Sequence, residues 1–263
     1  MTVAKTIAAH AVTAGANAAG RKIAKGAPRG SGRVGIDELA AIRLLAEVPP
    51  ERLQRLADIA SQHRAAPRAL ILEQDEECGA LYGVLEGRVE VFSRFDEQET
   101  VIDVAEPGAA LLLASVMSGL PYAAAARALS PARVLAIPAA GIRELFDGDK
   151  TFARAVACEL SRASYRMLAE LRSLKTRTSL ERLAAWLVDT ANAQSSGNGQ
   201  FRLPFGKRTL ASRLGMTPEC LSRSLRSLAD YGISVHGRDV TVTNPTALAA
   251  FVGAAVAAAG ADC

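Results

Sequence analysis

GMTPECLSRSLRSLADYGI, residues 215–233, has the apolar spacing of one helix that follows a glycine. Thr217 is suited to cap this helix, and Pro218 suits its first position, where a backbone N–H would be unpaired in any case. The preceding GKRTLASRL, residues 206–214, has helical spacing as well. A turn at Gly215 would let the two helices pack, and the pattern therefore predicts a helix-turn-helix. The leucines on the packing side are Leu221, Leu225 and Leu228.

The other side of the same helix predicts a polar row. Its members are Glu219, Ser222, Arg223 and Arg226. Glu219 and Arg223 are four residues apart, so a surface salt bridge is one interpretation of the pair. The other is contact with a DNA major groove, where an arginine can bridge O6 and N7 of guanine and a carboxylate can accept from a cytosine amino group. We predict that Glu219, Ser222 and Arg223 read bases.

Further side chains in this region suit contacts to the DNA backbone. ISVHGRDVTV, residues 233–242, predicts a hairpin whose tip would form a wing beside the groove. Arg213 of the first helix is also placed for a phosphate. The residues predicted to contact the backbone are Lys207, Arg208, Thr217, Arg226, His236 and Arg238.

The charge of the chain is segregated. Residues 1–34 carry six basic and no acidic side chains, residues 35–174 carry 15 basic and 21 acidic ones, and residues 175–263 carry ten basic and six acidic ones. A basic C-terminal part predicts that a polyanion binds at that end of the chain. The 34 N-terminal residues are rich in Ala and Gly and lack bulky aromatics, which predicts a disordered basic extension. A DNA-binding arm is the alternative.

Composition narrows the class of protein. No apolar run reaches the roughly 18 residues of a membrane span, and the N-terminus lacks the pattern of a secretory signal, so we expect no membrane contact and a cytoplasmic protein. The four cysteines and three histidines are scattered, which predicts neither disulfides nor a metal site built from side chains.

The middle of the chain predicts a β domain. Residues 36–64 suggest two short helices around Pro49-Pro50. Short alternating runs between residues 65 and 140, such as LYGVLEGRVEVFSR and TVIDVAEPGAALLLASV, are typical of an antiparallel barrel or jelly roll. We assign 35–141 to this domain, 142–174 to a long helix and 175–263 to the DNA-binding domain. The fold class is α+β.

The long helix carries an apolar seam with heptad-like spacing, which favours a two-stranded coiled coil and a homodimer. Packing of the helix on its own β domain is the alternative. The residues assigned to dimerisation are Val156, Leu160, Ala163, Met167 and Leu171.

LASRLGMTPECLSRSLRSLADYGISVHGRDVTVTNPTALAAF resembles the C-terminal winged helix of the CRP/FNR superfamily of bacterial transcription regulators, and LYGVLEGRVEVF resembles the start of its cyclic-nucleotide-binding-like β-roll. The resemblance implies a homodimer that binds double-stranded DNA and contacts RNA polymerase. Glu219, Ser222 and Arg223 match the E-x-x-S-R arrangement of the FNR-type branch, which implies inverted TTGA(T/C)-like half-sites.

The effector implied by the resemblance differs between branches. Cyclic-nucleotide binders carry Gly-Glu and Arg-Ser/Thr, whereas residues 108–129 read GAALLLASVMSGLPYAAAARAL, with Tyr122-Ala123 near the Arg-Ser position. We therefore expect no cyclic AMP, and the absence of an N-terminal cysteine group predicts no iron–sulfur cluster. LPYAAAARAL is similar to a segment of the nitrate respiration regulators, which implies haem and a response to nitric oxide or low oxygen. A regulator without a small-molecule effector is the alternative.

Cys220 lies in the predicted recognition helix and is a candidate oxidation switch; an ordinary, partly buried thiol is the alternative. An enzyme and a protein-binding module are the rival functions. PFGKRT and SVMSGL lack the residues of a phosphate loop and of a nucleophile elbow, so we predict no enzyme. A helix-turn-helix that binds a protein would not show the steep salt dependence of phosphate contacts.

Overall fold

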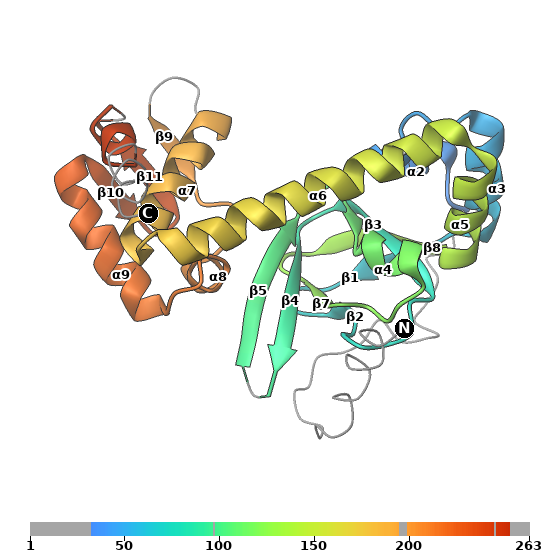
Figure 1. The fold of residues 1–263 in the computed structure, drawn as a ribbon, viewed down its shortest axis with the longest axis horizontal. Coiled ribbons are helices and arrows are strands. Elements are labelled where there is room, and N and C mark those ends of the chain that lie inside the picture. The colour runs from blue at the N-terminus through green and yellow to red at the C-terminus, as the bar shows by residue number, and fades with distance from the viewer. Residues whose placement is uncertain (1–32, 97, 195–198, 245, 253–263) are drawn as a thin grey trace. The chain divides into compact units, whose positions relative to one another are not determined.

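The computed structural model describes residues 33–96, 98–194, 199–244 and 246–252. The extension predicted for residues 1–34 therefore lies, except for its last two residues, outside the described residues. Contacts divide the chain into two compact units, 1–162 and 163–263. The division falls within the helix α6 (Lys150–Thr176), and Figure 1 labels the elements of both units.

Two four-stranded antiparallel sheets form the β-roll of the N-terminal unit. Their strand orders are β1-β8-β3-β6 and β2-β7-β4-β5. Gly87 turns the chain between β3 and β4 at a φ of +78°, and a Cβ there would lie 2.3 Å from the carbonyl oxygen of Pro131. Only glycine fits such a position. The strands are β1 (Ser61–Ala65), β2 (Leu70–Leu72), β3 (Ala80–Glu86), β4 (Val89–Phe95), β5 (Gln98–Ala105), β6 (Ala110–Leu111), β7 (Ala125–Ala128) and β8 (Ala132–Pro138).

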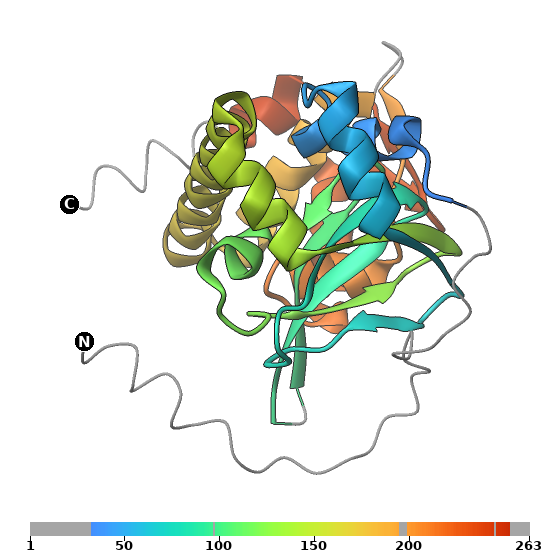
Figure 2. The same cartoon turned by 90° about the vertical axis from the view of Figure 1, so that its right-hand side faces the viewer.

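Short helices accompany the β-roll. α2 (Ile36–Ala40), the 3-10 helix η2 (Arg43–Leu45) and α3 (Pro50–Ile59) precede it, and α4 (Leu113–Ser118) and α5 (Ala139–Gly148) follow β6 and β8. Figure 2 shows α2, α3 and α5 gathered at one end of the sheets. Two short helical segments around Pro49-Pro50 were predicted and are present. The predicted helical extent to Arg64 is wrong, because residues 61–65 pair along their whole length with β8.

Two further predictions for the N-terminal unit need correction. LLLASV was predicted as a strand, but residues 113–118 form α4. The helix predicted from residue 142 to residue 174 is two helices, α5 and α6, separated by Asp149. The carboxylate of Asp149 accepts from the backbone N–H of Phe152 at 2.9 Å, so Asp149 caps a new helix.

α6 is anchored in the N-terminal unit by its first turns. Phe152 and Val156 are each 1% exposed and belong to the core of that unit. The assignment of Val156 to dimerisation is therefore wrong, because its side chain is already covered by its own β domain. Leu160 also packs partly against this core. Further along, α6 exposes an apolar stripe that consists of Met167, Leu168, Leu171 and Leu174.

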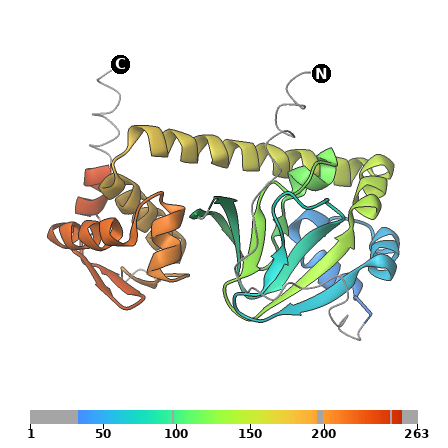
Figure 3. The same cartoon turned by 90° about the horizontal axis from the view of Figure 1, so that it is seen from below.

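The C-terminal unit is a winged helix-turn-helix, as predicted. The sheet order is β10-β11-β9, and Figure 3 shows the β10–β11 hairpin projecting from the unit. The single Trp186 packs against Phe205, with ring centroids 5.9 Å apart. The elements are α7 (Ser179–Gln194), β9 (Gln200–Arg202), α8 (Lys207–Arg213), α9 (Pro218–Ser227), the 3-10 helix η3 (Leu228–Tyr231), β10 (Ile233–His236), β11 (Asp239–Val242) and a final helical segment at 246–252.

Reciprocal caps begin α7. The N–H of Thr178 donates to the Glu181 carboxylate at 2.7 Å, and the N–H of Glu181 donates to the Thr178 hydroxyl oxygen at 3.3 Å. This capping box starts a new helix after α6. Within the described ranges, no helix combines the length and the apolar character that crossing a bilayer demands.

Candidate nucleic-acid interface

The start of α9 is fixed by local chemistry. The Thr217 side-chain oxygen accepts from the N–H of Cys220 at 3.2 Å, and Pro218 occupies the first turn. Gly215 has a φ of +62°, and a Cβ there would lie 2.9 Å from the Leu174 side chain. The turn therefore favours glycine, because a positive φ is costly for a residue with a Cβ. These contacts confirm the predicted cap and turn.

Glu219 is held by the same cap. The hydrogen bond from its own backbone N–H, and then the one from the Thr217 hydroxyl, lower the pKa of Glu219, and the nearby charge of Arg223 adds to the effect. An acidic group in the first turn also suits the helix dipole. The carboxylate is thus kept ionised and directed by Thr217.

The predicted polar row of α9 is on the surface. Glu219, Ser222, Arg223 and Arg226 are all exposed, whereas Leu221 is 1% exposed on the packing side. The Ser222 hydroxyl donates to the carbonyl of Pro218 at 2.9 Å, and Arg226 Nε donates to the carbonyl of Ser222 at 3.4 Å. The structure thus brings the three candidate base-reading residues together on one exposed helix face.

The candidate backbone contacts divide into two groups. Lys207 and Arg208 are exposed at the start of α8, and His236 is exposed at the hairpin. Arg213 instead faces α6, with its Nη2 atom 3.5 Å from a carboxylate oxygen of Glu170. Arg238 donates from Nε and Nη2 to the carbonyl of Leu203, at 2.9 and 2.5 Å. Part of the guanidinium of Arg238 therefore holds the wing in place.

Sequence reasoning missed Arg182, in the first turn of α7. Its guanidinium donates to three backbone carbonyls, two of them in the turn between α8 and α9. No local signal in the sequence points to this role, because the turn lies 32 and 33 residues further along the chain.

Cys220 is half-buried, in the first turn of α9. Its backbone N–H is the group bound by Thr217, so the cysteine lies directly beside the capped end of the helix. The oxidation switch at this position stays a prediction.

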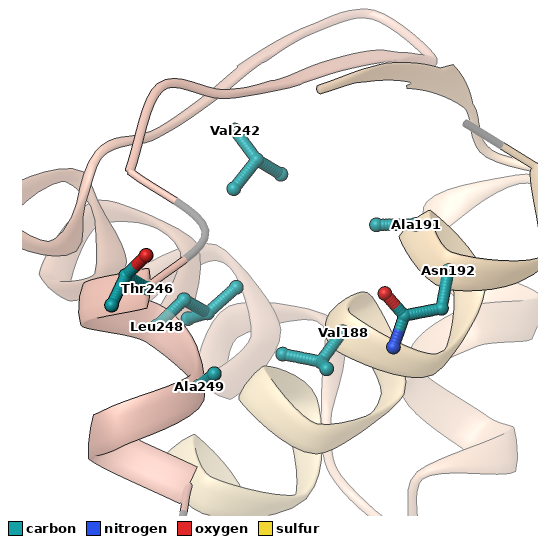
Figure 4. A pocket seen from close by; sticks show the side chains of 7 residues that line it. All are labelled: Val188, Ala191, Asn192, Val242, Thr246, Leu248 and Ala249. Atoms are coloured by element: carbon teal, nitrogen blue, oxygen red, sulfur yellow. The ribbon is translucent and has the colours of Figure 1, made fainter. Parts of the chain in front are cut away.

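A shallow hollow lies elsewhere in the C-terminal unit. Its lining comes from α7, β11 and the segment 246–252, and is apolar except for Asn192 and Thr246 (Figure 4). None of the residues predicted to contact DNA lines it, and none of its lining side chains is charged. The hollow is therefore separate from the candidate interface. The lining residues are Val188, Ala191, Asn192, Val242, Thr246, Leu248 and Ala249.

Comparison with known families agrees with this architecture at both ends of the chain. Residues 62–149 match the cyclic nucleotide-binding domain, and residues 181–251 match the Crp-like helix-turn-helix domain. The chain belongs to the CRP/FNR superfamily. It is thus a transcription regulator of the CRP/FNR type with a helix-turn-helix DNA-binding domain.

Individual CRP/FNR relatives are distant. The transcriptional activator protein FnrA of Stutzerimonas stutzeri is 24% identical over 209 residues, which are 78% of this chain and 86% of FnrA. A CooA mutant from Carboxydothermus hydrogenoformans has the same fold with a TM-score of 0.68 at 18% identity, covering 81% of this chain and 95% of CooA. FixK2 from Bradyrhizobium japonicum has a TM-score of 0.65 at 21% identity, and the match covers 73% of this chain and 96% of FixK2.

In this CRP/FNR protein the region that would hold a cyclic nucleotide is unsuited to one. Residues 108–129 contain no acidic side chain, and the arginine among them, Arg127, donates to Glu90 at 2.6 Å and to Glu99 at 2.5 Å. Tyr122 is 4% exposed, and its hydroxyl donates to the carbonyl of Ala80 and accepts from the N–H of the same residue. The side chains of Tyr122 and Arg127 are thus already engaged by protein partners.

The donors for a metal are also few. The described part of the chain contains no group of three or more His, Cys, Asp or Glu side chains placed to hold an ion. Haem needs only one axial His or thiolate. Cys78 does not fit that role, since its burial raises the pKa of the thiol and disfavours the ligating thiolate.

Proposed function

We propose that this regulator binds inverted TTGA(T/C)-like half-sites as a homodimer, with α9 of each subunit in a major groove. The observation that carries the proposal is the exposed face of α9, on which Glu219, Ser222 and Arg223 lie together in the E-x-x-S-R arrangement. Arg223 has the donor geometry for a guanine and the ionised Glu219 for a cytosine amino group. Lys207 and Arg208 then supply phosphate contacts from α8.

The stripe of α6 supports the homodimer. Met167 and Leu168 are 63% and 64% exposed, and Leu171 and Leu174 are each 50% exposed. Large apolar side chains at this spacing on one helix face are typical of a helix that pairs with a second copy. Two-fold symmetry of such a pair matches the two-fold symmetry of an inverted repeat.

The test is titration of a TTGAT-N4-ATCAA duplex and a scrambled duplex of equal length, each at two salt concentrations. We expect tighter binding to the inverted repeat at both concentrations, and weaker binding to both duplexes at higher salt. Equal affinity for the two duplexes would refute the half-site. Binding to neither duplex would point to a protein partner instead of DNA, and salt-insensitive binding would contradict contacts to the DNA phosphates.

For the effector, the observations favour a regulator without a cyclic nucleotide. Tyr122 lies near the position of the Arg-Ser pair of cyclic-nucleotide binders, and its hydroxyl is hydrogen-bonded to β3. Arg127 is paired with two carboxylates. In this interpretation, the activity of the regulator is controlled by the abundance of the protein or by oxidation of Cys220. The haem prediction, with nitric oxide or low oxygen as signal, is checked by the visible spectrum of protein prepared with haem present. A Soret band that shifts with the gas would support it, and a featureless spectrum would refute it.

A further inference from the structure

Arg182 connects three backbone carbonyls from two segments that lie far apart in the sequence. Its Nε donates to the carbonyl of Leu214 at 2.9 Å, its Nη1 to that of Arg177 at 2.7 Å, and its Nη2 to that of Gly215 at 3.3 Å. All four residues belong to the C-terminal unit. One planar group thus joins the end of α6 to the turn of the helix-turn-helix.

Two of these carbonyls belong to the end of α8. Leu214 is the C-cap of α8, and Gly215 is the turn residue that follows. The last carbonyls of a helix have no partner within the helix and carry partial negative charge. A guanidinium offers five donors in a rigid fork with a permanent positive charge, and it is therefore suited to hold several such carbonyls at once.

The chain leads directly from these carbonyls to the base-reading face. Only Met216 separates Gly215 from Thr217, and the N–H of Met216 is itself bonded to the carbonyl of Ala211 at 3.0 Å. Thr217 caps α9 and bonds the carboxylate of Glu219. A shift of the Leu214 and Gly215 carbonyls would therefore move the first turn of α9.

α6 also contacts this part of the helix-turn-helix. The Leu174 side chain lies against Gly215, and Glu170 pairs with Arg213. Arg177, whose carbonyl accepts from Arg182, directly follows the last residue of α6. The guanidinium thus completes a set of contacts between the end of α6 and the turn before α9.

We infer that Arg182 is a positioning residue for base reading: it fixes the first turn of α9, and with it Glu219, by holding the turn carbonyls, without itself contacting DNA. The inference rests on the proposed function, since it takes α9 as the base-reading helix. It predicts an effect on discrimination between sequences, not on attraction to DNA in general.

The test compares two identical substitutions. Arg182→Lys keeps the charge but replaces the planar fork by a single ammonium, which cannot reproduce three fixed hydrogen bonds. Arg202→Lys makes the same change at a side chain that is 72% exposed and lies 3.6 Å from Asp239. Both are made in the full-length chain. Any difference between them reports the hydrogen bonds of Arg182.

We expect Arg182→Lys to weaken binding to the TTGAT-N4-ATCAA duplex about tenfold or more, the effect of misplacing roughly one base contact, and to leave binding to scrambled DNA within about twofold. The slope of log affinity against log salt should stay unchanged, because no phosphate contact is lost. Arg202→Lys should change neither affinity. Equal losses on both duplexes, a lower salt slope, or no loss at all would overturn the inference.

A second measurement does not depend on DNA. Hydrogen exchange should accelerate in residues 214–223 of Arg182→Lys relative to Arg202→Lys, while β10 and β11 keep their protection. Unchanged exchange at 214–223 would overturn the inference, and so would faster exchange throughout the C-terminal unit, which would make Arg182 a residue of general stability. If the wild-type protein fails to discriminate between the duplexes, the half-site fails, and exchange alone decides the role of Arg182.

Discussion

Arg223 is the residue on which base reading depends most in the proposed complex. It is exposed on the second turn of α9, one residue from Ser222 and four from Glu219. Replacing it by Ala should cost roughly 1–3 kcal/mol on the inverted repeat and relax preference at one base pair, because a bidentate contact to guanine is lost. Competition titrations with single-base variants of the duplex measure both effects. Equal losses on specific and random DNA would refute the base-reading role.

Lys207 provides the matching test of a phosphate contact. It is exposed at the first residue of α8. Lys207→Ala should weaken binding to all sequences alike and lower the salt slope by about one per subunit, because a phosphate contact carries no sequence information. The same titrations measure it. A change in base preference would contradict this assignment.

Leu112 has a left-handed backbone, with φ +49° and ψ +41°, directly before α4. This conformation costs a residue with a Cβ roughly 1–2 kcal/mol, and glycine avoids that cost. Glycine in turn loses more conformational entropy on folding, because its unfolded chain is freer, and this offsets part of the gain. Leu112→Gly should therefore be more stable than Leu112→Ala by about 0.5–1 kcal/mol, although Ala keeps the packing of the Cβ that Gly loses. Denaturant midpoints of the two variants decide it, and a more stable Ala variant would show that the strain is absent.

At the level of single residues, the sequence predicted the exposed face of α9 but not the hydrogen-bond and ion-pair partners of the basic side chains. Arg213 was expected on phosphate, yet it lies against Glu170, 43 residues away. Arg182 and Arg238 hold carbonyls 32 and 35 residues away. Helical spacing gives the side of a helix on which a residue lies, whereas these partners are set by tertiary packing.

The sheet β2-β7-β4-β5 carries an ion-pair network that should respond to pH. Burial alone would raise the pKa of Glu99, but hydrogen bonds from Arg127 and Arg94 outweigh it and lower the pKa. The guanidinium of Arg127 also lies 4.1 Å from the centre of the Phe92 ring. The stabilisation from Glu99 is thus present above its unfolded-state pKa of about 4.3, and it is lost as the pH falls through the lower folded value.

Glu99→Gln should accordingly lower the thermal midpoint at neutral pH, and its deficit relative to wild type should shrink as the solution is acidified to about pH 3–4. Circular dichroism melts at several pH values measure this. A deficit that grows on acidification would contradict the pairing.

The stripe of α6 makes a prediction for a whole helix. Leu171→Glu should convert the protein from a dimer to a species near the chain mass of 27.5 kDa, because a carboxylate would be buried between two copies. Arg172→Glu introduces the same group one residue along, off the stripe, and should stay dimeric. Sedimentation measures both masses. A wild-type monomer, or a dimeric Leu171→Glu variant, would refute pairing through this stripe.

Elements with strong local signals were predicted well from the sequence. Thr217, Pro218 and Gly215 marked α9 and its turn because caps and left-handed turns depend on neighbouring residues only. β7 was missed, since its Ala-rich run has no strand preference and is a strand only through its pairing with β4 and β2. α4 was assigned to a strand for the same lack of a local signal.

For the whole molecule, the segregated charge predicts a steep salt dependence. If each of two subunits places Lys207, Arg208 and Arg226 on phosphates, about six contacts are made and the slope of log affinity against log salt should be roughly −5. The acidic stretch 35–174 should add no contact. Titrations over a range of salt concentrations measure the slope. A slope near zero would contradict binding through the DNA backbone, and one near half the expected value would indicate binding by a single subunit.

Trp186 gives this chain an internal optical reporter. The sequence contains no second tryptophan, and its indole packs against Phe205 within the unit that carries α9. Fluorescence excited at the red edge of the protein spectrum therefore comes from this unit alone, whatever the β-roll is doing. Binding of DNA, oxidation of Cys220 and local melting can each be followed in the unlabelled wild-type protein, and the quenching of a single emitter can be read without deconvolution.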